Sequence, residues 1–359
     1  MKPEYIIGGI ILLLLLLGIS VLFIPKQSPL PALSVLQGGD ENTGNSNSSS
    51  YKEIVRPAGF VNTEGVTLKE LVGKKVVLVD FLTYSCINCQ RTFPYLNAWY
   101  EKYKDQGLEI IGIHTPEFAF EKNIANVREA MKRFGIVHPI VLDNEYATWR
   151  AYGNQYWPRK YLIDIHGNIV YDHIGEGDYE IIESKIQELL KERASVLGET
   201  SSVGGLVSTA VPVTVSKAQS PETYFGASRN NYLGNGLSGR LGMVTYTTPS
   251  EIKPNTLYLG GAWNMTSENA ESVSEVEVTY VFNAKEVYLV ASAETESVIE
   301  VYQDGILISK KTGDVGSDGR LLVKESRLYT VIKNDSGGVH TLKLKIKAKG
   351  VQLYAFTFG

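Results

Sequence analysis

An apolar run that stops just before two cysteines constrains the fold of this chain more than any other feature. Lys75–Leu82 contains four consecutive aliphatic residues, so apolar side chains fall on both faces of an extended segment. This is typical of a buried central strand. The next stretch, Cys89–Gln106, has a helical apolar spacing, with Phe93, Leu96, Trp99, Tyr100 and Tyr103. The sequence therefore predicts strand, turn and helix, with Cys86 at the end of the strand.

Strands and helices continue to alternate after this unit. A second apolar run at Leu108–His114 precedes a stretch at Asn123–Phe134 whose apolar residues form one helical stripe. Two short strands, Tyr161–Ile165 and Ile169–Tyr171, flank a turn-forming His-Gly-Asn tripeptide, and a final helix ends near Ala194. We expect an α/β domain with a central mixed sheet that helices cover on both faces.

Beyond Pro221 the pattern changes to short strands without helices. The predicted strands are Val276–Phe282, Glu286–Ala291, Val298–Tyr302 and His340–Lys347. In the last of them leucine and isoleucine alternate with lysine, which indicates one buried face and one face in water. Asp304 and Gly305 predict a hairpin turn. We expect an all-β domain, built as an antiparallel, jelly-roll-like sandwich.

The N-terminus carries a candidate membrane span. Ile6–Ile24 is apolar apart from glycines and Ser20, and its length nearly matches a hydrocarbon core of about 30 Å. A cleaved signal peptide is the alternative, although the run is long for one and no A-x-A site follows it. Pro25–Ser50 is rich in Pro, Ser, Asn and Gly, which predicts a flexible tether. We therefore expect a single-pass protein of the cell membrane whose folded domains lie outside the cytoplasm.

These patterns divide the chain into five parts. We expect a membrane anchor at residues 1–25, a flexible linker at 26–50, the α/β domain at 51–195, a second linker at 196–216 and the β-sandwich at 217–359. The second linker is assigned because that stretch is rich in Ser, Thr, Gly and Val and shows no helical period.

The charge and the cysteine content exclude several classes of function. The formal net charge is -4 at pH 7, so the chain lacks the basic excess on which nucleic-acid binding depends. Its two cysteines lie three residues apart, so no disulfide joins distant segments. A four-coordinate zinc site would need two further ligands, and the five histidines form no H-x3-5-H pair. We expect no nucleic-acid partner, no metal and no cofactor other than a redox-active disulfide.

The C-x-x-C spacing is suited to thiol-disulfide exchange. Free N–H groups and the helix dipole stabilise a thiolate at a helix N-terminus, so Cys86 is the predicted nucleophile. Cys89, one helical turn further on, is close enough to form a disulfide with it and to resolve a mixed disulfide. The two cysteines alone do not decide whether the protein reduces or oxidises its substrates.

The segment around the cysteines resembles the active site of the thioredoxin family. The match consists of Val79-Asp80-Phe81, the C-x-x-C pair and Pro94. The resemblance implies that Asp80 serves proton transfer to Cys89, and a purely structural carboxylate at the strand end is the alternative. It also implies that Pro158 is a cis-proline beside the disulfide, where Trp157 and Pro158 bind substrate. An ordinary trans-proline that opens an edge strand is the alternative there.

Two motifs carry a narrower resemblance, to the extracytoplasmic thioredoxin domain of DipZ-type proteins, which are relatives of TlpA and ResA. They are Tyr84-Ser85-Cys86-Ile87-Asn88-Cys89 and His114-Thr115-Pro116-Glu117-Phe118. The resemblance implies that Glu117 is an acidic residue near the disulfide that tunes thiol reactivity. A glutamate of a surface loop is the alternative. We also assign Tyr84, just ahead of the cysteines, to substrate binding.

The resemblance continues through the second domain. Its motifs there are Ser220-Pro221-Glu222-Thr223-Tyr224, Gly261-Ala262-Trp263, Arg327-Leu328-Tyr329 and the terminal Tyr354-Ala355-Phe356-Thr357-Phe358-Gly359. In DipZ-type proteins this domain is similar to carbohydrate-binding modules, which implies a polysaccharide partner. Trp263 and Tyr224 are either sugar-stacking aromatics or core residues. Family members with the full architecture also carry a multi-span electron-transferring domain, so we expect this chain to use a separate membrane donor of the CcdA type.

Together these features predict a membrane-anchored, extracytoplasmic thiol-disulfide oxidoreductase that acts on protein disulfides, with reduction as the favoured direction. One alternative is a thiol peroxidase of the same fold, because Thr83 matches the motif P-x-x-x-T-x-x-C. Val79, however, takes the place of the proline in that motif. The other alternative is a cell-surface carbohydrate-binding protein with an accessory thiol domain, and the complete C-x-x-C motif disfavours it.

Overall fold

Strand β3 (Val76–Leu82) lies at the centre of a sheet in the computed structural model, which describes residues 49–208 and 218–359. All seven of its residues are buried. It pairs in parallel with β4 (Leu108–His114) and in antiparallel with β6 (Arg159–Ile163). The prediction of a buried central strand is confirmed.

Seven strands form this mixed sheet, in the order β1-β7-β6-β3-β4-β5-β2. The remaining strands are β1 (Ser49–Ser50), β2 (Gly59–Val61), β5 (Ile140–Leu142) and β7 (Asn168–Ile174). β3, β4 and β5 run in parallel, and the other pairs are antiparallel. We call residues 49–208, which contain this sheet, the α/β domain.

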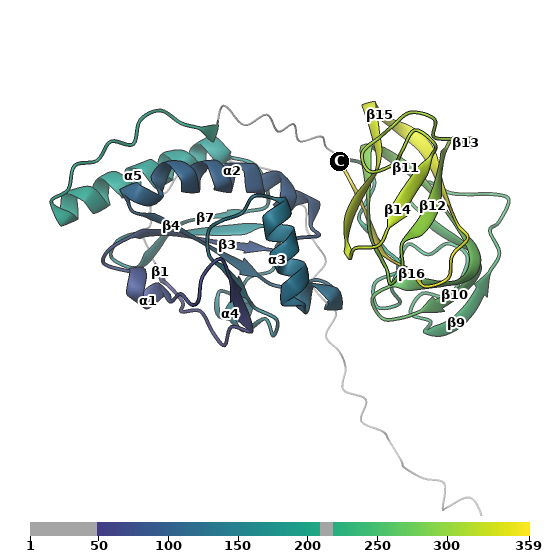
Figure 1. Ribbon diagram of the computed structural model, residues 1–359, viewed down its shortest axis with the longest axis horizontal. Coiled ribbons are helices and arrows are strands. Elements are labelled where there is room, and N and C mark those ends of the chain that lie inside the picture. The colour runs from purple at the N-terminus through teal and green to yellow at the C-terminus, as the bar shows by residue number, and fades with distance from the viewer. Residues whose placement is uncertain (1–48, 209–217) are drawn as a thin grey trace, which may run out of the picture. The chain divides into compact units, whose positions relative to one another are not determined.

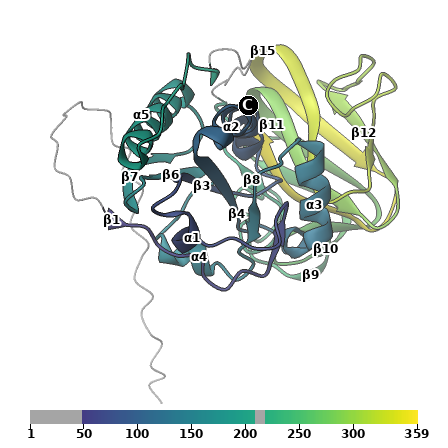
Figure 2. The same ribbon diagram turned by 60° about the vertical axis from the view of Figure 1, so that its left-hand side comes forward.

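Helices cover both faces of the sheet. On one face lie α2 (Ile87–Tyr103), α3 (Ile124–Arg133) and α5 (Tyr179–Leu197), with α2 and α5 side by side (Figures 1 and 2). The other face packs against α1 (Leu68–Leu71) and α4 (Ala147–Ala151). The short 3-10 helices η1 (Lys104–Gln106) and η2 (Ala119–Lys122) complete the domain. This arrangement confirms the thioredoxin-like α/β fold expected from the alternation of strands and helices.

The alternation of side chains along β3 decides what faces the cysteines. Val76, Leu78 and Leu82 belong to the core under α2 and α5, and Val77 and Val79 belong to the core on the opposite face. Because successive strand residues point to opposite faces, Asp80 points toward α2, the helix that carries Cys89.

The α/β domain extends further along the chain than expected. α5 ends at Leu197, and the backbone N–H groups of Val207 and Ser208 donate to the Glu183 carboxylate on that helix. The hydroxyl of Ser208 also accepts from the indole N–H of Trp99. Residues 196–208 of the predicted linker are thus held against α2 and α5, and its residues 209–216 lie outside the described residues.

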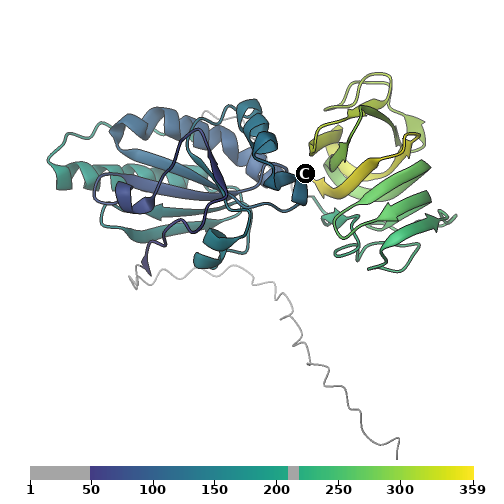
Figure 3. The same ribbon diagram turned by 60° about the horizontal axis from the view of Figure 1, so that its bottom comes forward.

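Residues 218–359, which we call the β-domain, contain strands and turns and no helix. The strands are β8 (Thr223–Tyr224), β9 (Gly242–Tyr246), β10 (Leu257–Met265), β11 (Ala270–Ala293), β12 (Ser297–Gln303), β13 (Ile306–Leu307), β14 (Arg320–Val323), β15 (Arg327–Ile346) and β16 (Val351–Phe358). All their pairings are antiparallel, and the strands wrap around one apolar core (Figure 3). An all-strand second domain is confirmed.

The separate strands predicted at Val276–Phe282 and Glu286–Ala291 are one strand, β11, so that detail of the prediction is wrong. The pairing register between β11 and β15 shifts at this point, because Ala284 pairs with Gly338 and Glu286 pairs with Lys333. Four residues of β15 therefore lie opposite one residue of β11, and β11 itself continues without a break. Hydrogen bonds consequently join all nine strands into one continuous sheet.

The alternation predicted near the end of β15 is present. Leu342, Leu344 and Ile346 are buried in the β-domain core, whereas Lys343 and Lys345 point to the partly exposed face. The hairpin predicted at Asp304 and Gly305 joins β12 to β13, and both turn residues have a positive φ, at 52° and 80°. Gly305 favours this left-handed conformation because it has no Cβ.

The predicted membrane anchor, Ile6–Ile24, and almost all of the first linker lie outside the described residues. Within residues 49–208 and 218–359, no helix has the length and apolar character needed to cross a bilayer.

Candidate functional site

Cys86 is the first residue of the site, and it caps the N-terminus of α2. It follows β3 after a short turn in which its backbone N–H donates to the carbonyl of Thr83. The side chain is partly exposed, and its Sγ lies 3.9 Å from the backbone oxygen of Trp157. Position and exposure fit the predicted nucleophile, since a helix N-terminus stabilises negative charge.

Cys89 lies in the first turn of α2 and is fully buried. Its thiol interacts with that of Cys86, and both cysteines are free thiols in the structure. Burial raises the pKa of Cys89 well above its ordinary value, and the contacts with Cys86 and Asp80 raise it further. Cys89 is therefore a protonated, shielded thiol that needs a base before it can attack.

The candidate base is Asp80, which is fully buried. Its Oδ1 lies 3.6 Å from Nζ of Lys160, which is itself 1% exposed. Burial raises the pKa of Asp80 to about 6, and the charge of Lys160 limits the rise. The structure thus places the carboxyl group on the Cys89 side of the sheet, as the thioredoxin resemblance implies. Lys160 was missed, because it lies just before the strand predicted at Tyr161–Ile165 and nothing in the nearby sequence indicates its partner.

The raised pKa of Asp80 predicts a pH-dependent stability. The native state binds this proton more tightly than the unfolded chain, so the stabilisation is complete below about pH 4 and is lost as pH rises through about 6. A shift of about two units corresponds to roughly 3 kcal/mol. We expect Asp80→Asn to lack this component when urea unfolding is followed by fluorescence at pH 4.5 and pH 7.5. Equal pH dependence in the two proteins would contradict the assignment.

The peptide bond between Trp157 and Pro158 is cis, which confirms that prediction and excludes the trans alternative. It precedes β6 and brings the Trp157 backbone oxygen next to Cys86. The Trp157 ring packs on that of Trp149, with centroids 4.4 Å apart. Trp157 thus borders the nucleophile, where it can contact a bound substrate.

Glu117 also borders the cavity at Cys86, but it is not a free surface residue. Its Oε1 accepts from Arg229 at 2.7 Å and from the hydroxyl of Tyr224 at 2.9 Å, and its side chain is 12% exposed. Both partners belong to the β-domain. Glu117 thus lies in a loop, but residues of the β-domain hold it, and any effect of Glu117 on the thiols acts through a carboxylate whose charge Arg229 already balances.

Tyr84 lies elsewhere than we expected. It is 2% exposed, its ring stacks on His114, and its hydroxyl donates to the backbone oxygen of Ser326 at 3.0 Å. It is not among the residues that line the cavity at Cys86. The assignment of Tyr84 to substrate binding is therefore corrected: the ring packs in the core of the α/β domain, and the hydroxyl binds the β-domain.

Glu121 of η2 organises the site and was not anticipated. It is fully buried, and its Oε1 accepts from the hydroxyls of Thr83 at 2.5 Å and Ser85 at 2.6 Å. Its Oε2 accepts from the backbone N–H groups of Glu117 at 2.6 Å and Phe118 at 3.0 Å. One carboxylate thus ties the turn before Cys86 to the loop of Glu117. In the sequence it looks like an ordinary charged residue of a loop, so no local pattern points to it.

The hydrogen bond to Glu121 also bears on the peroxidase alternative. Thr83, which matches that motif together with Cys86, donates its hydroxyl hydrogen to the buried carboxylate of Glu121. Together with Val79 in place of the motif proline, this leaves peroxide reduction without a supporting observation among the described residues.

Cys86 opens into a cavity of about 390 Å³. The α/β domain contributes Ser85, Cys86, Ile87, Asn88, Glu117, Gln155, Tyr156 and Trp157, and the β-domain contributes Ser220, Glu222, Tyr224, Arg229, Val290, Ala355, Thr357 and Phe358. Both domains belong to the single compact unit Asn47–Gly359. Within the described residues, no group of three or more His, Cys, Asp or Glu side chains is placed to hold a metal ion.

The two aromatic candidates for sugar stacking are not open platforms. Trp263 is fully buried in the β-domain core, and its indole N–H donates to the carbonyl of Gly260. The ring of Tyr224 is covered by the guanidinium of Arg229, 3.7 Å from the centroid. The core alternative therefore holds for Trp263, and a polysaccharide partner stays a prediction.

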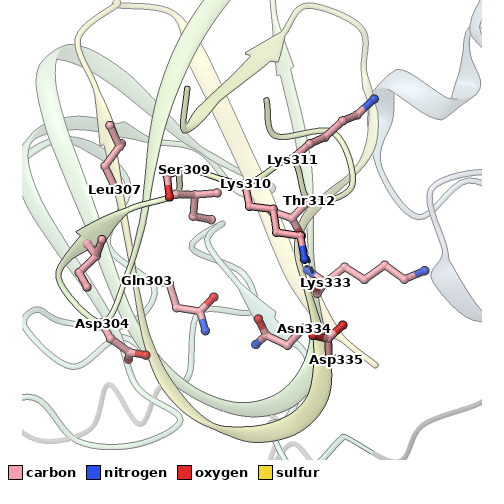
Figure 4. Close-up of a pocket in the computed structure, with 12 residues that line it drawn as sticks. Gln303, Asp304, Leu307, Ser309, Lys310, Lys311, Thr312, Lys333, Asn334 and Asp335 are labelled. Atoms are coloured by element: carbon pink, nitrogen blue, oxygen red, sulfur yellow. Dashed lines mark hydrogen bonds between the residues drawn. The ribbon is translucent and has the colours of Figure 1, made fainter. Parts of the chain in front are cut away.

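A separate cavity of about 380 Å³ lies in the β-domain between the β12–β13 hairpin and β15 (Figure 4). Gln303 and Asn334 extend toward one another in it, whereas Lys311 points away. Lys333 is paired with Glu286 at 3.3 Å. No aromatic ring is among the described residues that line it, so it lacks the stacking surface typical of a sugar site.

Comparisons with known proteins agree with this geometry. Residues 52–190 match the Redoxin family, and residues 220–359 match the family described as "Thioredoxin like C-terminal domain". The thiol-disulfide oxidoreductase ResA of Halalkalibacterium halodurans is 36% identical over 131 residues, which cover 36% of this chain and 70% of ResA. The chain belongs to the thiol-disulfide oxidoreductases of the thioredoxin fold.

Within this family, similarity to DipZ extends across both domains. DipZ of Mycobacterium tuberculosis is 37% identical over 307 residues, which cover 84% of this chain and 41% of DipZ. The chain thus spans less than half the length of that relative. Among solved structures, the thioredoxin domain of a thiol-disulfide oxidoreductase from Bacteroides vulgatus is 25% identical, covers 40% of this chain and 99% of that chain, and has a TM-score of 0.33. The resemblance to DipZ-type and ResA-like proteins is confirmed.

Proposed function

We propose that this protein reduces disulfides in protein substrates through Cys86 and Cys89. The observation that carries the proposal is the contrast between the two thiols. Cys86 is partly exposed at the start of α2 and opens into a cavity, while Cys89 is fully buried behind it. An accessible nucleophile backed by a shielded second thiol is what a two-step exchange requires.

The first step is attack of the Cys86 thiolate on one sulfur of the substrate disulfide. The substrate S–S bond breaks, a mixed disulfide forms with Cys86, and the departing thiolate takes a proton from water. In the second step Cys89 gives its proton to Asp80 and attacks Sγ of Cys86. The second substrate thiolate leaves and is protonated, and a Cys86–Cys89 disulfide remains. The substrate gains the two electrons that the dithiol loses.

Asp80 is suited to the second step because above its pKa of about 6 it is a carboxylate, the form that accepts a proton. Its pKa of about 6 lies closer to that of a thiol than an ordinary aspartate's does, which lowers the cost of a transient proton transfer. The charge of Lys160, 3.6 Å away, stabilises the carboxylate once the proton has left. The same path run backward would deprotonate Asp80 and return a proton to Cys89.

Reduction of the substrate is the favoured direction because the cavity at Cys86 has little positive charge from side chains. Strong oxidants of this fold owe their potential to a stabilised reduced form. Among the described residues that line the cavity, Arg229 is the cation, and it is paired with Glu117. We expect a reduction potential near -270 mV and far from -120 mV, measured by equilibrating the full chain in redox buffers. A value above about -180 mV would reverse the assigned direction.

The cellular setting belongs to the proposal as well. We propose that Ile6–Ile24 anchors the protein, that its domains work outside the cytoplasm and that a membrane protein of the CcdA type supplies electrons. The apolar N-terminal run and the likeness to DipZ support this. Disulfide reduction in membranes that lack such a donor is the test. Undiminished activity there would reject the donor while leaving the exchange chemistry intact.

A further inference from the structure

The β-domain forms one wall of the cavity into which Cys86 opens. On one side of this cavity lie Cys86 and Trp157, and on the other lie Tyr224, Val290 and Thr357. The nucleophile is therefore reached through a space bounded by both domains.

An apolar cluster holds this wall against the α/β domain. Ile87, directly after the nucleophile, and Phe118 pack in it with Tyr288, Val290, Leu328, Tyr354 and Ala355 of the β-domain. Ile87 is only 8% exposed as a result. The β-domain thus covers the apolar residue next to the nucleophile.

Polar contacts surround the apolar cluster. The hydroxyl of Tyr84 donates to the Ser326 carbonyl, and Ala119 N–H donates to Glu268 at 2.8 Å. Arg91 of α2 lies 3.8 Å from the Glu286 carboxylate. Glu117 is bonded to Arg229 and Tyr224, as described above. These bonds come from several segments of the α/β domain, so the wall is fixed at many points.

The size of the cavity limits what reaches Cys86. A folded partner that docks through its surface buries about 800 Å² on each side. A cavity of about 390 Å³ is in the range that encloses a small molecule or a few residues. With Ile87 covered and the cavity walled on two sides, a flat protein face cannot approach the sulfur, whereas an extended segment can.

The charges of the cavity favour a basic segment. Of the charged residues that line it, Glu117 and Arg229 neutralise each other at 2.7 Å. Glu222 remains, with its Oε2 2.5 Å from the hydroxyl of Tyr224. Burial and the nearby Glu117 raise the pKa of this carboxyl to about 7, so above pH 7 Glu222 gives the cavity a net negative charge that attracts cations and repels acidic groups.

We propose that the β-domain is a substrate-selecting part of the active site, which admits disulfides carried on narrow, unfolded and basic polypeptide segments and excludes those on folded surfaces. This inference rests on the proposed function, since it names the substrates of the same cysteine pair. Glu222 sets the preference for basic substrate segments. Thr357 lies on the wall that limits the width of the cavity.

The charge preference is tested with the full chain and three disulfide probes. Two are short unfolded peptides with one intramolecular disulfide, flanked by lysines in one and by glutamates in the other. The third is a folded protein with a surface disulfide. At pH 8 and low salt, where Glu222 is ionised, we expect kcat/KM to be at least fivefold higher for the lysine peptide than for the glutamate peptide. For the folded protein we expect kcat/KM to be at least 100-fold lower than for the lysine peptide. Glu222→Gln brings the ratio of the two peptides to within twofold.

The width is tested by filling the cavity. Thr357→Trp places a large side chain in it and should lower kcat/KM for the lysine peptide at least tenfold. Alkylation of Cys86 by iodoacetamide, a small reagent, should change less than threefold, and the buried Cys89 should stay unmodified, which shows that the variant is folded. The matched control is Thr245→Trp, an exposed position on β9 outside the cavity, where neither rate should change.

The outcomes separate the two proposals. Equal turnover of the folded protein and the peptides, or an unchanged peptide rate in Thr357→Trp, overturns the selecting wall while the exchange activity stands. An unchanged lysine preference in Glu222→Gln overturns the role of that residue. No turnover of any probe by the unmodified chain refutes the proposed function, and the inference with it.

Discussion

Cys86→Ser is expected to lower disulfide turnover by at least a thousandfold. A serine hydroxyl is not ionised at neutral pH and does not attack a disulfide, whereas the thiolate at the N-terminus of α2 does. Turnover of a peptide disulfide by the full chain measures the loss.

Cys89→Ser is the matched variant for this experiment. It keeps the nucleophile but removes the buried thiol that resolves the mixed disulfide. We expect it to stop after the first step, with the substrate attached to Cys86, and intact-mass spectrometry would detect this adduct. The roles of the two cysteines would be reversed if Cys86→Ser retained turnover. They would also be reversed if Cys86→Ser formed the adduct, on Cys89.

Glu121→Ala is expected to lower the free energy of unfolding of the α/β domain by about 3–5 kcal/mol. The fully buried carboxylate accepts from two hydroxyls and three backbone N–H groups on two separate segments. Each buried donor left without a partner costs roughly 1–3 kcal/mol, although the hydroxyls can turn to other partners. The turn before Cys86 should also loosen, so alkylation of this thiol should change in rate.

Urea unfolding at pH 7 measures the stability change, with tryptophan fluorescence as the signal. Trp99, Trp149 and Trp157 report on the α/β domain and outnumber Trp263 of the β-domain. Glu129→Ala, an exposed position on α3, is the control and should stay within about 0.5 kcal/mol of the unmodified chain. A loss below about 1 kcal/mol in Glu121→Ala would mean that water or a neighbouring group replaces the carboxylate, and that Glu121 does not organise the site.

Local sequence patterns predicted much of this site. The strand ending before Cys86, the helix beginning at it and the spacing to Cys89 follow from residue types within about thirty positions, because strand and helix periodicity are short-range properties. The thioredoxin resemblance pointed to Asp80 and to the cis bond at Pro158, and the structure places both beside the cysteines.

Other parts of the site depend on partners far away in the chain. Lys160 reaches Asp80 only because β6 pairs with β3. Tyr84 seemed available to substrate until the structure showed its hydroxyl bonded to Ser326. The strand break expected near Ala284 is absent, since the neighbouring strand β15 pairs with β11 on both sides of the register shift there. None of these pairings leaves a mark in the nearby sequence.

The sequence by itself determined the chemistry: two thiols one helical turn apart after a buried strand, because a helix places residues three positions apart next to each other. Only the tertiary structure decided which groups surround those thiols. Glu121, Lys160 and the β-domain wall are brought to Cys86 by packing between segments up to about 270 residues apart, from Cys86 to Thr357. Such contacts depend on the free energy of the whole fold, so no local window of sequence contains them.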